Sequence, residues 1–259
     1  MKGFTILATD IFHMSFKKHI PNIITLGNLL FGTLATIFAV GGYFEMTALF
    51  VALGVFLDFF DGFFARILKV SGEFGKQLDS LADMVTSGVV PGIVLFVLLG
   101  NNQQMPYEIH TEFKISMGLP LIGLLVTLSA CYRLAKFNLD TRQSESFIGL
   151  PTPAMSLFVV SLPLVQMYTD IDLAKDLIAN NYFLIGVTVF FSFIMNSELP
   201  LFSLKFKNYG IRENLFKYIL ITLSIVLVVT VEYLSVPIVI VSYILLSMFN
   251  NFNKTNTSS

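Results

Sequence analysis

Residues 57–83 read LDFFDGFFARILKVSGEFGKQLDSLAD, and this apolar stretch carries four aspartates, Asp58, Asp61, Asp79 and Asp83. Ionisable side chains in membrane helices are costly and usually functional. Asp58 and Asp61 are spaced i,i+3, and Asp79 and Asp83 are spaced i,i+4, so each pair projects from one face of its helix. Two pairs of like charge in apolar surroundings need a cation.

The rest of the chain is composed like a membrane protein. Of its 259 residues 55% are hydrophobic and 13% are charged, and the mean hydropathy is +0.77, which is far from a soluble globular domain. Because a spanning helix needs about 20 mostly apolar residues, we expect an all-α, polytopic bundle of about eight spans. The candidate spans are 22–41, 46–66, 76–99, 116–136, 151–168, 180–196, 215–231 and 235–249. The last two are either a tight hairpin near Glu232 or one span and a re-entrant piece.

The basic residues predict the orientation of these spans. With the N-terminus in the cytoplasm, only Lys114 and Lys175 of the 16 Lys and Arg residues fall outside, which leaves 16 − 2 = 14 at the inner side. Inner loops of membrane proteins carry an excess of Lys and Arg. We therefore expect a multi-pass protein of the cell membrane, with both termini in the cytoplasm.

No polar linker divides the chain into separate domains. We expect a cytoplasmic segment over residues 1–19, one membrane domain over 20–249 and a disordered tail over 250–259. The first segment resembles an amphipathic helix lying in the membrane surface. Its predicted apolar face consists of Phe4, Leu7, Ile11 and Met14. The single cysteine, Cys131, excludes an intrachain disulfide, and no Cys/His cluster has the spacing of a zinc site.

The depth of the four aspartates predicts that they converge. The second span approaches the cytoplasm near Arg66 and the third leaves it near Gly75, so these two helices should run antiparallel. A helix rises about 1.5 Å per residue, so counting from Arg66 and Gly75 gives the depth of each aspartate in the membrane. Asp61 and Asp79 lie at a depth of about 6–8 Å, and Asp58 and Asp83 at about 12 Å. Oxygen ligands of this kind favour Mg²⁺ or Mn²⁺, and two such ions would clamp a pyrophosphate.

Small residues accompany the aspartates. Gly62 and Ala65 in the second span, with Gly72 and Gly75 in the following loop, let backbone approach a ligand or another helix closely. Arg66 would then face an anion. Close helix packing alone also explains the glycines, and a place at the membrane boundary also explains Arg66.

The spacing of eight of these residues resembles the signature of the CDP-alcohol phosphotransferases. The fixed positions are Asp58, Asp61, Gly62, Ala65, Arg66, Gly75, Asp79 and Asp83. The resemblance implies a helical membrane core that forms homodimers, with its site open to the cytoplasm. It further implies that the four aspartates hold two metal ions and that Asp83 is also the general base. Gly62, Ala65, Arg66 and Gly75 would line the CDP pocket, with Arg66 near the phosphates.

Three further segments are similar to the integral-membrane phosphatidylserine synthases of bacteria, a subgroup of this family. They are IPNIITLGNLLFG at 20–32, DSLADMVTSGVVPG at 79–92 and RLAKFNLDTRQSESFIGLPTPA at 133–154. The resemblance covers roughly residues 20–165. It implies that the serine hydroxyl attacks the phosphorus of CDP-diacylglycerol and that CMP leaves. Because an alcohol is a poor nucleophile, this reaction requires a base such as Asp83.

Other polar residues are candidates for substrate contacts. Asn22, Thr25 and Asn28 in the first span could reach the nucleotide, or hydrogen-bond a neighbouring helix. The carboxylate of serine needs a cation, for which the fourth span and the following loop offer three candidates. These are Arg133, Lys136 and Arg142. Each is also explained as an anchor at the inner membrane boundary.

Two alternatives remain open at this point. The acceptor could be glycerol phosphate, inositol phosphate or choline instead of serine. From a different class of protein, a cation- or proton-coupled transporter would also carry membrane aspartates, but near the midplane and on broken helices. A purely structural bundle is excluded by the cost of burying four carboxylates, and no nucleic-acid-binding surface is visible.

Overall fold

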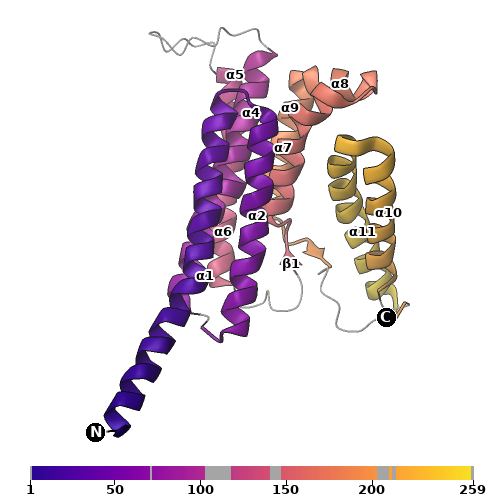
Figure 1. Ribbon diagram of the computed structural model, residues 1–259. Coiled ribbons are helices and arrows are strands. Elements are labelled where there is room, and N and C mark those ends of the chain that lie inside the picture. Colours follow the sequence, from indigo (N-terminus) through magenta and orange to yellow (C-terminus); the bar gives the residue numbers. More distant parts are fainter. Residues whose placement is uncertain are drawn as a thin grey trace.

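The computed structural model describes residues 2–70, 72–102, 118–140, 147–202, 210–211 and 214–257. For residues 2–18, 147 and 252–257 it describes the backbone alone. The described chain is almost wholly helical, as the sequence predicted (Figure 1). The predicted face of the N-terminal segment and the cations Lys114 and Arg142 therefore lie outside the described side chains.

The first half of the chain forms long helices that run the length of the bundle (Figure 1). They are α1 (Lys2–Val40), α2 (Phe44–Ile67), α3 (Glu73–Asp83), the π-helix η1 (Met84–Val89) and α4 (Val90–Asn101). The last three follow one another without a break, so the third predicted span is one helix with a π-helical turn inside it. α1 packs against α2, α3, η1 and α4.

A tight turn joins α2 to α3. Lys69 adopts the left-handed conformation, with φ 55°, and the amide of Val70 donates to the carbonyl of Ala65 at 3.0 Å. A left-handed residue just after the last turn is a common way to end a helix. The chain thereby reverses direction and brings α3 back along α1.

The second half completes the bundle and adds a hairpin. Its elements are α5 (Gly118–Leu121), η3 (Ile122–Leu124), α6 (Leu125–Leu139), β1 (Phe147–Ile148), α7 (Thr152–Tyr168), α8 (Asp172–Ala179), α9 (Asn181–Asn196), β2 (Pro200–Leu201), α10 (Leu215–Val231), η4 (Glu232–Leu234) and α11 (Ser235–Thr257). The two short strands pair antiparallel, with Ile148 opposite Pro200. α4 and α7 supply much of the buried core, including Leu95, Met155 and Val159.

The outer helices carry apolar side chains on their exposed faces. Phe59 of α2, Phe193 of α9 and Val229 of α10 are 64%, 74% and 79% exposed. Exposed apolar side chains on this scale would aggregate in water but suit contact with lipid. The described helices are thus those of a multi-pass membrane protein.

The number of spans is only partly as predicted. Five described helices are long and apolar enough to cross a membrane, or six if α8 and α9, bent by 77°, count as one span. Residues 215–251 count as one of the five, although the chain turns at η4 and α10 packs beside α11 as a hairpin (Figure 1). α7, with 17 residues, is somewhat short.

Both chain ends differ from the segments expected there. α1 is a single helix from Lys2, so the N-terminal segment is continuous with the first span. α11 extends to Thr257, whereas the sequence suggested disorder from residue 250. Polar composition alone did not reveal that the last helix continues past its apolar part.

Candidate active site

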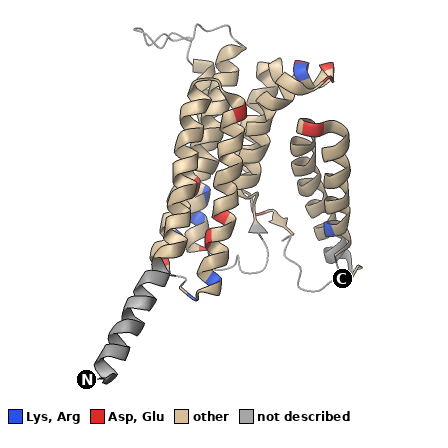
Figure 2. Cartoon of the chain, viewed as in Figure 1, with Lys and Arg blue, Asp and Glu red and all other residues tan. Residues whose placement is uncertain are grey.

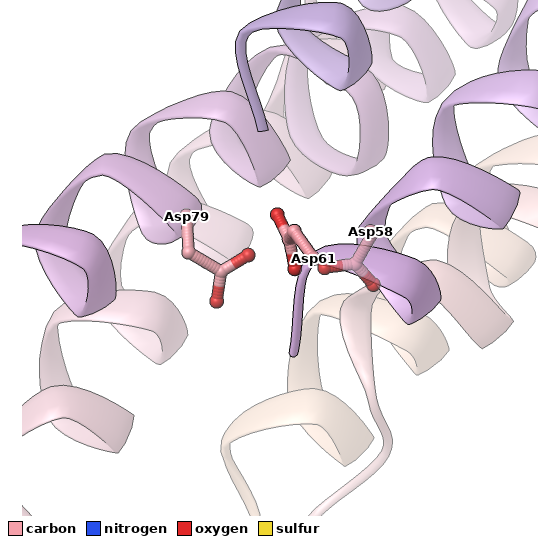
Figure 3. Close-up of side chains that lie close together, drawn as sticks. All are labelled: Asp58, Asp61 and Asp79. Atoms are coloured by element: carbon pink, nitrogen blue, oxygen red, sulfur yellow. The ribbon is translucent and has the colours of Figure 1, made fainter. Parts of the chain in front are cut away.

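Three of the four aspartates lie together. Asp58 and Asp61 from α2 and Asp79 from α3 each offer an oxygen, and these oxygens all lie within 4.8 Å of one another. Figure 3 shows the Asp79 carboxylate facing the two carboxylates of α2. The i,i+3 spacing puts Asp58 and Asp61 on one helix face, and the turn after α2 brings Asp79 opposite them.

The chemistry of this cluster fits a divalent cation. Oδ1 of Asp79 is buried and has no hydrogen-bond partner. In the part of the chain that the structure describes, no Lys or Arg forms an ion pair with any of the four aspartates; the ion pair found there joins Lys136 to Glu198. Neighbouring carboxylates without a compensating cation repel each other strongly in a medium of low polarity. Carboxylate oxygens are the ligands that Mg²⁺ and Mn²⁺ prefer.

Asp83 occupies a separate place at the end of α3. It lies outside the group of three carboxylates and is 9% exposed. Its Oδ1 accepts a hydrogen bond from Nδ2 of Asn28 at 3.1 Å. The structure thus places Asp83 one helical turn from Asp79, with a partner on α1.

The first helix supports both parts of the site. Oγ1 of Thr25 donates to Oδ2 of Asp61 at 2.5 Å, while Asn28 holds Asp83. Thr25 and Asn28 were candidates for nucleotide contacts, and the structure shows each of them bonded to a carboxylate. For Thr25 and Asn28 the structure thus confirms the alternative that the sequence offered, a hydrogen bond to a neighbouring helix.

A cavity of about 220 Å³ opens beside the cluster. Its walls come from α1, the end of α2, the following loop and the start of α3, and they include Gly62, Ala65, Gly75, Asp61 and Asp79. A Cβ at Gly62 would meet nothing within 4 Å, so that position is open toward the cavity rather than closed by helix packing.

The wall of the cavity contains Lys76 but not Arg66. Arg66 is not among the cavity-lining residues, and its Nε donates to the carbonyl of Gly62 at 2.9 Å within its own helix. Lys76, which the motif does not single out, does line the cavity. Its Nζ donates to the backbone oxygen of Asn138 at 2.6 Å, and Nδ2 of Asn138 donates to Ser80 at 2.9 Å. These bonds fasten the outer side of α3 to α6.

Arg133 lies in a junction between α6, the loop before α7 and the end of α9. Its guanidinium donates to the backbone oxygens of Ile148 at 3.0 Å, of Gly149 at 3.1 Å and of Met195. The residue is 7% exposed. Lys136, one turn further along α6, pairs with Glu198 at 3.8 Å.

The contacts of Arg133 predict a structural effect on mutation. Arg133→Met should lower the melting temperature in detergent by several degrees, because buried carbonyls that lose their donor cost about 1–3 kcal/mol each. Unfolding of the purified variant, followed by intrinsic fluorescence beside Lys136→Met as a control, measures this effect. An unchanged melting temperature with a raised KM for serine would instead assign Arg133 to the acceptor pocket.

Comparisons with known proteins agree with the geometry of the site. A family model described as CDP-alcohol phosphatidyltransferase matches residues 18–196. The chain is 36% identical over 149 residues to the CDP-diacylglycerol–serine O-phosphatidyltransferase of Bacillus subtilis (strain 168), covering 56% of this chain and 75% of that protein. It is 32% identical over 225 residues to the enzyme of the same name from Helicobacter pylori (strain ATCC 700392 / 26695), covering 83% of this chain and 84% of that protein.

An archaeal relative carries a different name. The archaetidylserine synthase of Methanothermobacter thermautotrophicus is 28% identical over 171 residues, covering 64% of this chain and 67% of that protein. The matched region contains all of the residues that form the aspartate cluster and its cavity. This chain belongs to the CDP-alcohol phosphatidyltransferase family.

Proposed function

We propose that the protein transfers the phosphatidyl group of CDP-diacylglycerol to L-serine, which forms phosphatidylserine and CMP. The observation that carries this proposal is the convergence of Asp58, Asp61 and Asp79 beside an open cavity. The acceptor follows from relatives named as serine O-phosphatidyltransferases. The protein is therefore a transferase of phospholipid biosynthesis.

The aspartates would hold two ions of Mg²⁺ or Mn²⁺. Asp58, Asp61 and Asp79 supply ligands from two helices, and Asp83 is close enough along α3 to contribute as well. When bound, the ions supply positive charge that neutralises the diphosphate and the departing phosphate oxygen. The orphaned Oδ1 of Asp79 is the clearest sign that the protein leaves a ligand position for a cation.

Asp83 is the proposed general base. Because Asn28 occupies its Oδ1, Oδ2 is left to accept the proton of the serine hydroxyl. The serine oxygen then forms a bond to the phosphorus that carries diacylglycerol, and the bond between this phosphorus and the CMP oxygen breaks. The proton stays on Asp83 until solvent removes it. General-base catalysis of this kind typically contributes about 10²–10⁴-fold.

The cavity would receive the CDP group. Gly62, Ala65 and Gly75 form parts of its wall that a nucleotide can approach closely, and Thr25 lies at the boundary between the cavity and the cluster. Lys76 adds a positive charge within this wall, suited to a phosphate or a carboxylate. Arg66, which lies one helical turn from Gly62 and outside the cavity lining, would contact the phosphates from beyond the wall.

The carboxylate of serine requires a cation near α6. Arg133, Lys136 and Arg142 are the proposed residues, and Arg133 would act mainly by holding the loop before α7, since its guanidinium already serves backbone carbonyls. The side chain of Lys136 is 38% exposed and pairs with Glu198 at 3.8 Å, so its ammonium is available to a stronger partner.

The placement of charge supports the orientation. Among the residues that the structure describes, the basic ones gather toward the same end of the bundle as the aspartate cluster, apart from one in α8 (Figure 2). We therefore infer that the site and both termini face the cytoplasm of a bacterial cell. We further infer that the membrane domain at 20–249 crosses the membrane eight times, with the N-terminal part of α1 continuing from the first span on the cytoplasmic side. The protein would act as a homodimer, as expected from the family.

Incorporation of radiolabelled L-serine tests the proposed function. The purified protein, given CDP-diacylglycerol and Mn²⁺, should move the label into lipid that extracts into chloroform. A chelator should stop the incorporation, because the aspartates cannot hold the diphosphate without a cation. Label that stays in the aqueous phase while CMP is released would show that water or another alcohol is the acceptor.

A further inference from the structure

Behind the cavity, a buried chain of hydrogen bonds leads to Asp83. Nδ2 of Asn28 donates to Oδ1 of Asp83 at 3.1 Å, and Oγ1 of Thr86 donates to Oδ1 of Asn28 at 2.7 Å. Asn28 and Thr86 are both fully buried, and neither lines the cavity. These hydrogen bonds therefore lie outside the wall of the cavity, and Asn28 makes the bond to a neighbouring helix that the sequence offered as an alternative.

The chemistry of the three groups fixes their order. An ionised carboxylate only accepts hydrogen bonds, so the amino end of the Asn28 side chain has to face Asp83. The opposite end is then a carbonyl oxygen, which needs a donor. Thr86 supplies that donor, and its hydroxyl thereby supports the orientation that the carboxylate requires; the same hydroxyl also lies 3.2 Å from the backbone oxygen of Asn28.

Two glycines in neighbouring helices leave space for the side chain of Thr86. A Cβ at Gly54 of α2 would lie 2.8 Å from Cγ2 of Thr86 and 2.9 Å from Oδ1 of Asn28. A Cβ at Gly32 of α1 would overlap Oγ1 of Thr86. Two helices therefore lack a side chain at the points where they close around this residue.

Thr86 belongs to the π-helix that begins directly after Asp83. π-helical turns inside α-helices are rare and occur frequently at functional sites. Here Oγ of Ser156 donates to the carbonyl of Thr86 at 3.2 Å. This hydrogen bond ties the π-helical turn to α7, in addition to its contacts with α1 and α2. Because the backbone of Thr86 is held in this way and its side chain is short, the position of its hydroxyl is well defined.

We propose that Thr86 is a positioning residue for the phosphatidyl transfer, because its hydroxyl orients the Asn28 amide that holds the Asp83 carboxylate. The inference rests on the proposed function, since it assigns Thr86 to the base of that reaction. Loss of the hydroxyl would leave the buried Oδ1 of Asn28 without its side-chain donor, so that the amide would be held less firmly against Asp83. The base would then be displaced from the serine hydroxyl, while the cavity that binds CDP-diacylglycerol would stay as it is.

The test compares Thr86→Val, which replaces the hydroxyl by a methyl group, with Thr86→Ser, which keeps the hydroxyl. We expect Thr86→Val to lower kcat about tenfold, with the KM for CDP-diacylglycerol changed less than about twofold. Thr86→Ser should restore kcat to within about threefold of wild type. Thr188→Val is the matched control, because Thr188 is equally buried but bonds only the backbone oxygen of Leu184, at 2.8 Å.

A stability cycle gives a second measurement that does not depend on activity. Thr86→Val, Asn28→Ala and the double variant should change the melting temperature non-additively, because the two side chains are joined by a hydrogen bond. If Thr86→Val does not fold, Thr86→Ala takes its place in both experiments.

The inference is overturned if Thr86→Val keeps its kcat, if Thr86→Ser is as impaired as Thr86→Val, or if the cycle is additive. A failure of the proposed function is distinguishable from these results. It would appear in the wild-type protein, as a lack of serine-dependent CMP release, whereas failure of the present inference appears only in the variants.

Discussion

Asp79→Asn should reduce serine-dependent CMP release by about 10³-fold or more, because a lost metal ion removes several kcal/mol of charge stabilisation and each 1.36 kcal/mol is tenfold in rate. Asparagine has the same shape but only one acceptor oxygen. Asp79 contributes an oxygen to the cluster within 4.8 Å of those of Asp58 and Asp61. Steady-state CMP release at saturating Mn²⁺ measures the loss.

The same variant should fold at least as well as the wild type when no metal is added. Replacing one of three neighbouring carboxylates by an amide removes repulsion, so the melting temperature in chelator should stay the same or rise. Mn²⁺ should stabilise the wild-type protein by binding its folded state, and this stabilisation should be lost in Asp79→Asn. Asp172→Asn, in the exposed first turn of α8, is the control. Full activity in Asp79→Asn would contradict a metal site at this cluster.

Asp83→Asn should lower kcat by about 10²–10⁴-fold, the usual contribution of a general base. The KM for CDP-diacylglycerol should change much less, because Asp83 is not among the residues that line the cavity. The amide oxygen at position 83 can still accept the hydrogen bond from Asn28, so the packing of α1 against α3 should persist. Single-turnover CMP release separates the chemical step from substrate binding.

The stabilisation by Mn²⁺ distinguishes a base from a ligand in this second experiment. In Asp83→Asn at least part of that stabilisation should remain, since Asp58, Asp61 and Asp79 are intact. If Asp83→Asn loses it as completely as Asp79→Asn does, Asp83 acts as an essential metal ligand and another group has to accept the proton.

The sequence predicted the helices and three members of the aspartate cluster because these depend on short-range periodicity, whereas Asp83, expected to join them, lies outside the group of three. The apolar stretches at 151–168 and 180–196 correspond to α7 and α9 within one or two residues. Asp58 and Asp61 had to share a helix face, and the short connection to α3 limited where Asp79 could lie. For these features the spacing along the chain determines the geometry.

Contacts between distant segments were out of reach for the same reasoning. Nothing in the spacing indicates that Lys76 meets Asn138 at the end of α6, or that Arg133 serves carbonyls near β1 and α9. The π-helix after Asp83 was also missed, because MVTSGV has no composition that separates it from an ordinary helical turn. The bond between Thr86 and Asn28 depends on that turn and on two glycines in other helices.

The acceptor alcohol is the central claim, and CMP release by the purified protein tests it most directly. CDP-diacylglycerol and Mn²⁺ or Mg²⁺ would be supplied with L-serine, glycerol 3-phosphate, inositol phosphate or choline in parallel reactions. The account predicts CMP release that depends on L-serine and stops when a chelator is added. Release with glycerol 3-phosphate, inositol phosphate or choline in place of serine would contradict the assigned acceptor, and release with none of them would contradict the enzyme itself.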